Sequence, residues 1–327
     1  MRSDIAKVAP HPAGAAVRAS VARLEQGPRR KVQKGIWIAS YPKSGNTWLR
    51  IFIHNLLRET RRRAEGREAG ARIGPQDINK LNERTDWEIG AAHFDRVLGK
   101  PAAQASRAEI ARARAAIHMR LAERRAGPFF IKTHNCVANV EGFPTVNMEM
   151  TLAAICIVRN PLDIAISYAH HCDLSIDRII GHMADRSAVS LATETVVYEF
   201  MSSWSFHVAS WMSVPDRPVL ILRYEDLLRS PERHFSRAAA FLRIEPTPAQ
   251  LRGAIANSSF QALAAQEARN GFVERPQKAE KFFRAGKSGQ WREVLTRAQI
   301  ASIIKSHAPM MQRFGYLPLD CGAPTQP

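Results

Sequence analysis

Ala39–Trp48 has the sequence ASYPKSGNTW, which resembles a nucleotide-binding P-loop with several positions changed. In the pattern G-x-x-x-x-G-K-[ST], Gly45 and Thr47 occupy the second glycine and the hydroxyl positions. Ser40 replaces the first glycine and Asn46 replaces the lysine, which leaves Lys43 as the only lysine of the loop. An ATP-binding loop needs its lysine to reach the β- and γ-phosphates. The loop therefore predicts a site for an anion other than a nucleoside triphosphate.

The residues on either side of this loop predict a strand and a helix. Gly35–Tyr41 is short and apolar, as buried strands are, and Asn46–Leu57 has apolar residues at helical spacing. A strand–loop–helix turn offers backbone N–H groups and a positive helix end to an anion. Lys43 adds a charge, Ser44 and Thr47 add hydroxyls, and Gly45 allows close approach of the backbone.

The remaining sequence alternates between predicted strands and helices. We expect strands at Pro128–His134, Leu152–Val158 and Val219–Arg223. We expect helices at Ala105–Arg125, Asp163–His171, Thr193–Trp211 and Pro231–Leu242, and a solvated segment without pattern at Arg58–Ile73. Such alternation is typical of an α/β fold, with a central parallel sheet flanked by helices. Ligands of these folds bind beyond the carboxyl ends of the strands, where Lys43, Lys132 with His134, Arg159 and Tyr224 are expected.

The composition favours a globular protein with anionic ligands. The chain has 327 residues, of which 45% are hydrophobic, and its 47 Lys and Arg against 30 Asp and Glu give a formal charge of +17. This charge is compatible with anionic small molecules, nucleic acid or acidic membrane surfaces. Cys136, Cys156, Cys172 and Cys321 form no C-x-x-C pair, which argues against zinc and redox sites, and Cys156 is expected in the core.

The termini and the hydropathy complete the expected organisation. Residues 1–34 are basic and predict a flexible arm, residues 35–318 a single domain, and residues 319–327 a tail. No continuous apolar signal region is present near the N-terminus, and the longest apolar run, Leu152–Val158, is far shorter than the ~20 residues of a membrane span. We therefore expect a cytoplasmic protein.

The loop sequence YPKSGNTW closely resembles the 5′-phosphosulfate loop of the cytosolic-type sulfotransferases, usually YPKSGTTW. That family uses 3′-phosphoadenosine 5′-phosphosulfate (PAPS) as sulfuryl donor and has a P-loop nucleotide-kinase-like α/β fold. The resemblance implies that the donor is bound by Lys43, Ser44, Gly45, Asn46, Thr47 and Trp48. Asn46 replaces a threonine, and its amide is expected to preserve anion binding. Trp48 suits either purine stacking or core packing.

Two further segments resemble the family's 3′-phosphate sites. IVRNPLDIAISYAHH, Ile157–His171, matches R-N-P-x-D-x-x-x-S-Y, which implies that Arg159 and Ser167 hold this phosphate. FFRAGKSGQWREVLT, Phe282–Thr296, resembles R-K-G-x-x-G-D-W and adds Arg284 and Gly286. Ala285 stands at the lysine position, and Lys287 is a candidate replacement.

Short matches imply the adenine contacts and the catalytic groups. LRYEDL assigns Tyr224 to the adenine, and NSSF assigns Ser258 and Phe260. FIKTH resembles the family's F-x-K-T-H segment, whose histidine is the catalytic base, so the resemblance assigns His134 to this role. A histidine suits proton transfer near neutral pH. Lys132 would steady the transferring sulfuryl group and Lys43 the leaving phosphate oxygen, and no metal is required.

The acceptor and two alternative functions stay open at this stage. The acceptor is expected to be a small molecule bearing a hydroxyl or an amine. Its site is expected in the loops Arg58–Lys100, Val137–Glu149 and Asp173–Val189, with an apolar wall drawn from Trp87, Phe94, Phe143, Met148 and Met150. The alternatives are a P-loop kinase that uses ATP with Mg²⁺ and a basic nucleic-acid-binding protein. The family's dimerisation segment is poorly matched by Arg292–Ala301, so the oligomeric state is not predicted.

Overall fold

A five-stranded parallel sheet forms the centre of the protein. The computed structural model describes residues 33–64, 74–125, 127–276 and 279–317. The strand order is β2-β3-β1-β6-β7, and every neighbouring pair is parallel. These strands are β1 (Gly35–Ser40), β2 (Thr85–Trp87), β3 (Phe129–Thr133), β6 (Thr151–Val158) and β7 (Val219–Arg223). β4 (Asn139–Val140) and β5 (Phe143–Pro144) form a separate antiparallel pair.

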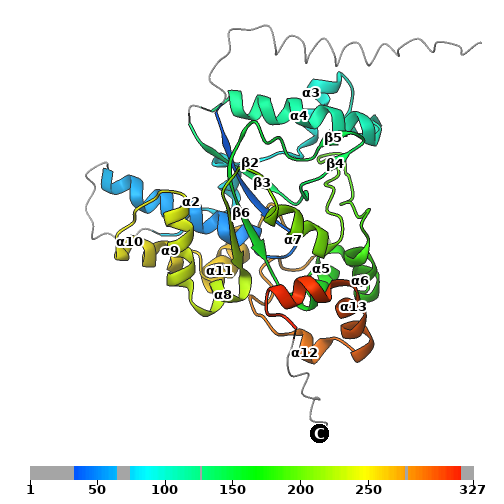
Figure 1. The fold of residues 1–327 in the computed structure, drawn as a ribbon. Helices are drawn as coiled ribbons and strands as arrows, with labels where there is room; N and C mark the ends of the chain where they lie inside the picture. The colour runs from blue at the N-terminus through cyan, green and yellow to red at the C-terminus, as the bar shows by residue number, and fades with distance from the viewer. Residues whose placement is uncertain (1–32, 65–73, 126, 277–278, 318–327) are drawn as a thin grey trace, which may run out of the picture.

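Helices cover both faces of this sheet (Figure 1). Those before β6 are α2 (Asn46–Ala64), η1 (Ile78–Glu83), α3 (Ala91–Leu98), η2 (Ala102–Gln104) and α4 (Arg107–Glu123). Between β6 and β7 lie α5 (Pro161–Cys172), α6 (Ile176–Ala184) and α7 (Trp204–Met212). After β7 follow α8 (Tyr224–Arg229), α9 (Pro231–Phe241), α10 (Pro248–Asn257), α11 (Phe260–Asn270), α12 (Trp291–Val294) and α13 (Arg297–Arg313).

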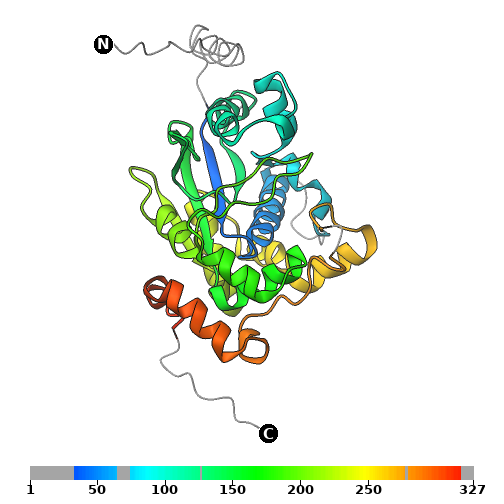
Figure 2. The ribbon, with the colours of Figure 1, turned by 90° about the vertical axis from the view of Figure 1, so that its right-hand side faces the viewer.

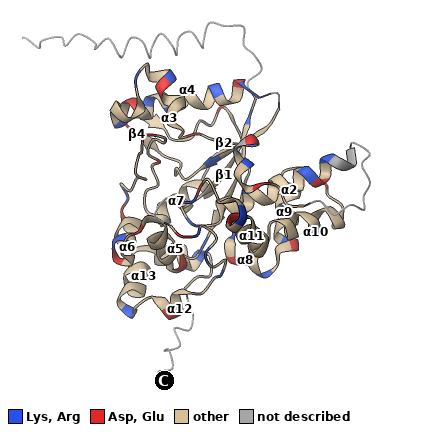
Figure 3. Ribbon diagram, turned by 180° about the vertical axis from the view of Figure 1, so that it is seen from behind, with Lys and Arg blue, Asp and Glu red and all other residues tan. Residues whose placement is uncertain are grey.

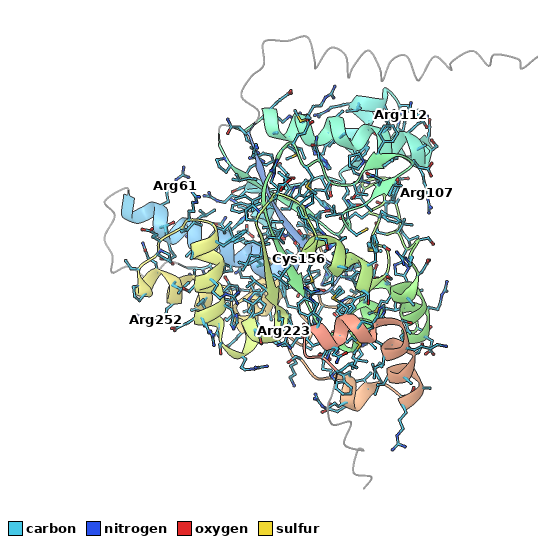
Figure 4. The ribbon with its side chains drawn as sticks, viewed as in Figure 1. Arg61, Arg107, Arg112, Cys156, Arg223 and Arg252 are labelled. Atoms are coloured by element: carbon cyan, nitrogen blue, oxygen red, sulfur yellow. The ribbon has the colours of Figure 1, made fainter. Side chains whose placement is uncertain are left out.

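The strands alternate their side chains between two hydrophobic cores. Trp37 and Cys156 pack with α4, α5 and α7, whereas Ile38 and Ile155 pack with α2, α9 and α10 on the opposite face. Figure 2 shows the two groups of helices on either side of the strands. Cys156, labelled near the centre of Figure 4, is fully buried, which confirms its predicted place in the core. Full burial of an aliphatic side chain such as that of Ile38 stabilises the fold by about 1.5–3 kcal/mol.

The predicted α/β fold with a parallel sheet is confirmed, and the four predicted strands are present with ends that shift by at most one residue. β2 was not predicted, because three residues give no measurable periodicity. The prediction of a patternless segment at Arg58–Ile73 is wrong in its first part, since α2 continues to Ala64. Arg and Glu are good helix formers without any apolar pattern, so helical propensity extends α2 beyond its buried face.

The predicted helix Thr193–Trp211 is wrong in its first half. The helix α7 begins only at Trp204, with the Ser203 side chain accepting a hydrogen bond from the backbone N–H of Phe206. Ser202 has a φ of 55°, a left-handed conformation that no α-helix contains. The residues directly before it belong to no helix, and two of them, Val196 and Phe200, form isolated bridges with Gly90 and Val189.

The structure describes few residues at the two ends of the chain. Residues 1–32 and 318–327 lie outside the described residues, and they contain nearly all of the predicted arm and the whole predicted tail. The boundaries of the predicted single domain, 35–318, therefore stay a prediction. Among the described helices, none combines the length and apolar character that a membrane crossing requires.

Candidate active site

The carboxyl ends of four strands open into one cavity of about 870 Å³. Its lining includes Lys43 after β1, Lys132 and His134 at the end of β3, Arg159 after β6 and Tyr224 after β7. Because parallel strands end at the same edge of a sheet, residues far apart in sequence meet here. Other site residues predicted from sequence that line this cavity are Gly45, Asn46, Thr47, Trp48, Ser167, Phe260, Arg284 and Gly286.

The loop between β1 and α2 has the backbone of an anion-binding turn. Lys43 and Gly45 have φ values of 65° and 108°. A Cβ added to Gly45 would lie 2.9 Å from Cδ2 of Tyr224, so both backbone conformation and space require glycine there. α2 is 19 residues long and begins directly after this turn, which places its positive end at the cavity.

The side chain of Asn46 has a different role from the one expected. Its Nδ2 donates to the carbonyl of Ile38 at 2.8 Å, and its Oδ1 accepts from Nε of Arg50 at 3.0 Å. The side-chain amide is thus engaged within the protein, and the part of Asn46 in donor binding stays a prediction. The Ser44 side chain lies outside the residues that line the cavity, and its hydroxyl is buried without a hydrogen-bond partner among the described residues.

Thr47 takes part in an ion-pair network that was not predicted from sequence. Its hydroxyl donates to Glu274 at 3.2 Å and accepts from Nη2 of Arg50 at 3.1 Å. Arg50 and Glu274 form a salt bridge of 2.6 Å, and Arg50 is 1% exposed. Glu274 lines the cavity, whereas Arg50 lies behind it. The spacing of Asn46 and Arg50, one helical turn, is the only sequence signal of this network, because Glu274 lies more than 220 residues away.

Arg159 joins the loop to the late basic segment. Its Nη1 donates to the carbonyl of Lys43 at 2.9 Å, and its Nη2 to the carbonyl of Lys287 at 3.0 Å. The guanidinium carbon lies 4.4 Å from the ring centroid of Tyr224, which is a cation–π distance. Nε is buried and has no partner among the described residues. Arg159 lines the cavity beside the loop, so its guanidinium brings a full positive charge to this wall, which favours an anion there.

The late segment is fixed by α5 and by a close glycine contact. Asp163 accepts backbone hydrogen bonds from Gly289 at 2.6 Å and Trp291 at 3.2 Å. Gly286 has a φ of 59°, and a Cβ there would lie 2.3 Å from the ring of Phe260. Glycine at this position therefore allows the Phe260 ring to lie against the segment at the cavity wall.

The basic groups of this segment differ from the family pattern. Arg284 is exposed, lines the cavity and donates to the side chain of Gln290 at 3.1 Å. Ala285 also lines the cavity, but the exposed Lys287 does not. Only the backbone carbonyl of Lys287 reaches Arg159. The Lys287 side chain therefore does not take the place of Ala285 in the cavity lining.

The predicted adenine residues divide into lining and supporting residues. The half-buried Trp48 lines the cavity, donates from Nε1 to the carbonyl of Ser258 at 2.8 Å, and meets the rings of Tyr224 and Phe235 edge-on. Trp48 thus both lines the cavity and packs. Ser258 is fully buried, and its hydroxyl bonds to Ala254 and Asn55. Since the Ser258 side chain lies outside the lining, it supports the wall, and the structure gives it no direct place at a ligand.

The imidazole of His134 is held in one orientation by β1. Nδ1 lies 2.7 Å from the carbonyl oxygen of Ser40, an atom that only accepts. Nδ1 therefore carries the hydrogen and Nε2 has the free lone pair. Burial, and next the charge of Lys132, hold the pKa of His134 well below 6.5. The ring is neutral at physiological pH, and Nε2 is ready to accept a proton.

Two lysines supply positive charge to the same cavity. Burial lowers the pKa of Lys132, whose ammonium nitrogen lies 4.7 Å from the ring centroid of Trp87. Burial, and next the charge of Arg159, lower the pKa of Lys43 to about 8. Nζ of Lys43 lies 3.3 Å from Nδ1 of His171 and 4.3 Å from the ring centroid of Phe282. Both lysines gain from an anion in the cavity, because negative charge opposes the cost of burial.

The far part of the cavity is mostly apolar. It is lined by Trp87, Ile89, Leu174, Ile179, Val189 and Met201. Of the five apolar wall residues expected from sequence, only Trp87 is present in the lining. Phe94 and Met150 are fully buried in the core, and Phe143 and Met148 lie outside the lining. The expected segment Asp173–Val189 contributes to this wall, whereas Val137–Glu149 does not.

Comparisons with known proteins agree with this architecture. The family model described as "Sulfotransferase domain" matches residues 33–315. Sulfotransferase 1B1 of Canis lupus familiaris is 26% identical over 272 residues, which cover 81% of this chain and 79% of that protein. Flavonol 3-sulfotransferase of Flaveria bidentis is 23% identical over 290 residues, 83% of this chain and 79% of that protein.

Solved structures show the same fold at low identity. Mouse sulfotransferase SULT7A1, complexed with PAP, superposes with a TM-score of 0.55 at 19% identity and covers 89% of this chain and 88% of that chain. Retinol dehydratase in a complex with retinol and PAP gives a TM-score of 0.54 at 19% identity, with 94% and 88% covered. The family match spans most of the chain, so the protein belongs to the sulfotransferase domain family, and the predicted class, an enzyme that transfers a sulfuryl group from PAPS, is confirmed.

Proposed function

We propose that the cavity binds PAPS across the ends of β1, β6 and β7 and that an acceptor hydroxyl or amine enters from the apolar side. The 5′-phosphosulfate would meet the start of α2, Lys43 and the Thr47 hydroxyl. The 3′-phosphate would be held by Arg159, Ser167 and Arg284. The observation that carries the donor assignment is the guanidinium of Arg159, which lines the cavity and bonds to the carbonyl of Lys43 in the anion-binding turn.

The adenine would lie against the aromatic part of the lining. Trp48, Tyr224 and Phe260 surround this region, and Gly286 allows Phe260 its close position. Stacking on an aromatic ring contributes about 1–3 kcal/mol per base in nucleic-acid complexes, which gives the scale for one adenine.

In the proposed reaction, Nε2 of His134 accepts the proton from the acceptor while the acceptor oxygen, or nitrogen, attacks the sulfur. The new bond to sulfur forms as the bond between sulfur and the 5′-phosphate oxygen breaks. The products are the sulfated acceptor and 3′,5′-adenosine bisphosphate (PAP). Lys132 would stabilise charge on the transferring sulfuryl oxygens, and Lys43 charge on the leaving phosphate oxygen.

The general-base role predicts a specific kinetic separation. Replacing His134 with Ala should lower turnover about 10²- to 10⁴-fold, because the proton acceptor is lost. PAP binding should be nearly unchanged, because the proposed donor contacts do not involve this side chain. The test is transfer of ³⁵S-labelled sulfuryl from PAPS to a panel of small phenols, alcohols and amines, beside calorimetric titration of PAP. Normal turnover by His134→Ala would refute the base assignment.

The kinase and nucleic-acid alternatives have less support. The loop lacks the lysine that an ATP site requires, and the chain belongs to a sulfotransferase family. Lys and Arg occur on α4 and α13, at opposite ends of the molecule (Figure 3). Basic charge is thus spread over distant elements of the described chain rather than gathered on one of them. A cytoplasmic location is part of this proposal, since the proposed donor is a nucleotide.

A further inference from the structure

Glu199 is an acidic residue within the proposed active site that the sequence motifs did not indicate. Among the described residues, only Glu199 and Glu274 are acidic members of the cavity lining. Glu274 lies at the donor loop, whereas Glu199 belongs to the segment between α6 and α7 that contains no helix or strand. It is 4% exposed. A carboxyl group so well buried at a cavity wall has few means of stabilisation other than the groups beside it.

Hydrogen bonds fasten the Glu199 segment to the end of β3. The backbone N–H of His134 donates to Oε1 of Glu199 at 2.6 Å, and the backbone N–H of Glu199 donates to Oγ of Ser190 at 2.8 Å. The next residue, Phe200, donates its N–H to Oδ1 of Asn135 at 2.7 Å and accepts from the N–H of Cys136 at 2.8 Å. The segment around Glu199 is therefore fixed by hydrogen bonds to Ser190 and to the residues that follow β3. The Glu199 carboxylate in turn fixes the backbone of His134.

The charged groups around Glu199 come from four elements. Lys132 on β3 attracts its ionised form, and Arg114 on α4 does so more weakly. Glu88, after β2, repels it, and Tyr168 on α5 is coupled to it. Burial outweighs these charges and raises the pKa of Glu199 to about 7. The carboxyl group is thus neutral in acid and ionised above neutral pH.

The nearby carboxylate of Glu88 already has its own partners. It forms ion pairs with His118 and Arg114, and it accepts hydrogen bonds from Thr133 and Asn135. Burial and these partners act in opposite directions, and the partners win, since the pKa of Glu88 is lowered to about 2. Glu88 is therefore committed to the wall behind the cavity. Lys132 has two other carboxyl neighbours, Glu274 at the donor loop and Glu199, and Glu199 is the one that also accepts a hydrogen bond from His134.

The proposed reaction creates an electrostatic problem that Glu199 is placed to solve. Proton transfer to Nε2 of His134 forms an imidazolium ion in a buried site next to the ammonium of Lys132. Burial, and next the like charge of Lys132, oppose this step, as the lowered pKa of His134 indicates. A carboxylate that bonds to the backbone of His134 and faces Lys132 offsets the accumulated charge.

We propose that Glu199 is a positioning residue of the sulfuryl-transfer site: its carboxylate fixes the backbone of His134 and supplies the negative charge that balances Lys132 and the imidazolium. This inference rests on the proposed general-base role of His134. It assigns the ionised form of Glu199 to the active enzyme, so that activity follows the ionisation of this residue.

The first test observes the carboxyl group directly. Infrared difference spectra of the wild-type protein and Glu199→Gln are recorded through a pH titration, without any substrate. A carboxylic-acid band that is lost with a midpoint near pH 7 is expected in the wild type and not in the variant. Glu123→Gln, at the exposed end of α4, is the matched control and should keep the band. A wild-type titration without this band, or the same band in Glu199→Gln, would overturn the inference.

The second test separates charge from geometry. The amide of Glu199→Gln still accepts the hydrogen bond from His134 but has no charge. For transfer from PAPS to 4-nitrophenol, kcat/KM of the wild type should fall below about pH 7, whereas the variant should lack this limb. The plateau value of kcat/KM in Glu199→Gln should be about tenfold lower than in the wild type, which corresponds to a change of one unit in the pKa of His134. An unchanged profile in Glu199→Gln would mean that Glu199 only supports the backbone.

Calorimetry with PAP distinguishes this inference from the proposed function itself. Wild type and Glu199→Gln should bind PAP equally, because Glu199 lies outside the proposed donor contacts. Equal binding together with an unchanged pH limb would overturn the role of Glu199 and leave the proposed function intact. A wild-type protein that does not bind PAP would overturn both.

Discussion

Replacing Arg159 with Lys should weaken PAP binding selectively at the 3′-phosphate. Arg159 is 6% exposed and donates to the carbonyls of Lys43 and Lys287, and its Nε has no partner in the part of the chain that the structure describes. A lysine retains the charge but loses the planar fork that grips a phosphate. Loss of one charge-assisted hydrogen bond costs about 1.5–3 kcal/mol, which corresponds to a roughly 10- to 150-fold higher Kd.

The assay compares two nucleotides so that loop disturbance is separated from phosphate recognition. Calorimetric titrations of wild type and Arg159→Lys are made with PAP and with 5′-AMP, which lacks the 3′-phosphate. Affinity for 5′-AMP should change by less than about threefold. Neither the wild type nor the variant can make the 3′-phosphate contact with this nucleotide, because it lacks that phosphate. Equal weakening for the two nucleotides would show that Arg159 acts only by holding the backbones of Lys43 and Lys287. No change for either nucleotide would remove Arg159 from the donor site.

Two further predictions concern buried ionisable side chains. Glu274→Gln should lower the melting temperature, because it leaves Arg50 without its charged partner. The same change should tighten PAP binding about tenfold, because it removes a negative charge beside the anion-binding loop. Calorimetry that finds weaker PAP binding contradicts this second expectation. Burial lowers the pKa values of His54, His171 and His207 to about 3 in the folded protein, against an ordinary value of 6.5. The unfolded chain therefore binds protons more readily, and the stability that these neutral histidines maintain above pH 6.5 should be lost as the pH falls toward 3. Melting temperatures that stay constant through this range would contradict the burial argument.

Most of the fold was predictable because its signals are local. The strand, loop and helix around Gly45 each have their own pattern, and the parallel sheet follows from the alternation of strands and helices. The same local view failed at Ser202, whose left-handed backbone interrupts an apparently continuous helical pattern. It also missed β2, whose three residues depend on pairing with β3 for their conformation.

The candidate site was predicted best where one strand end carries one motif. The motif residues Lys43, Lys132, His134 and Arg159 do meet in the cavity, since strand order and parallel direction determine where they lie. Residues that reach the cavity through long-range packing had no such signal. Glu274 is held at the cavity by its ion pair with the buried Arg50, and Glu199 is held there by its hydrogen bond from the backbone of His134. For these residues, the tertiary contact is the only evidence of their place.

The same limit applies to the acceptor wall and to Asn46. Aromatic residues such as Phe94 have the same composition signal whether they line a cavity or fill a core, and the structure places Phe94 in the core. Asn46 has an amide donor at the expected position, but this donor bonds to the carbonyl of Ile38, and the amide oxygen accepts from Arg50 one turn later.

The central claim is that the cavity recognises a nucleotide with a 3′-phosphate. Its most direct test is calorimetric titration of the wild-type protein with PAP, beside ATP with Mg²⁺ under the same conditions. We expect clear binding of PAP and much weaker binding of ATP, because Arg159, Ser167 and Arg284 are proposed to contact the 3′-phosphate. Equal or stronger binding of ATP, or no binding of PAP, would contradict the account.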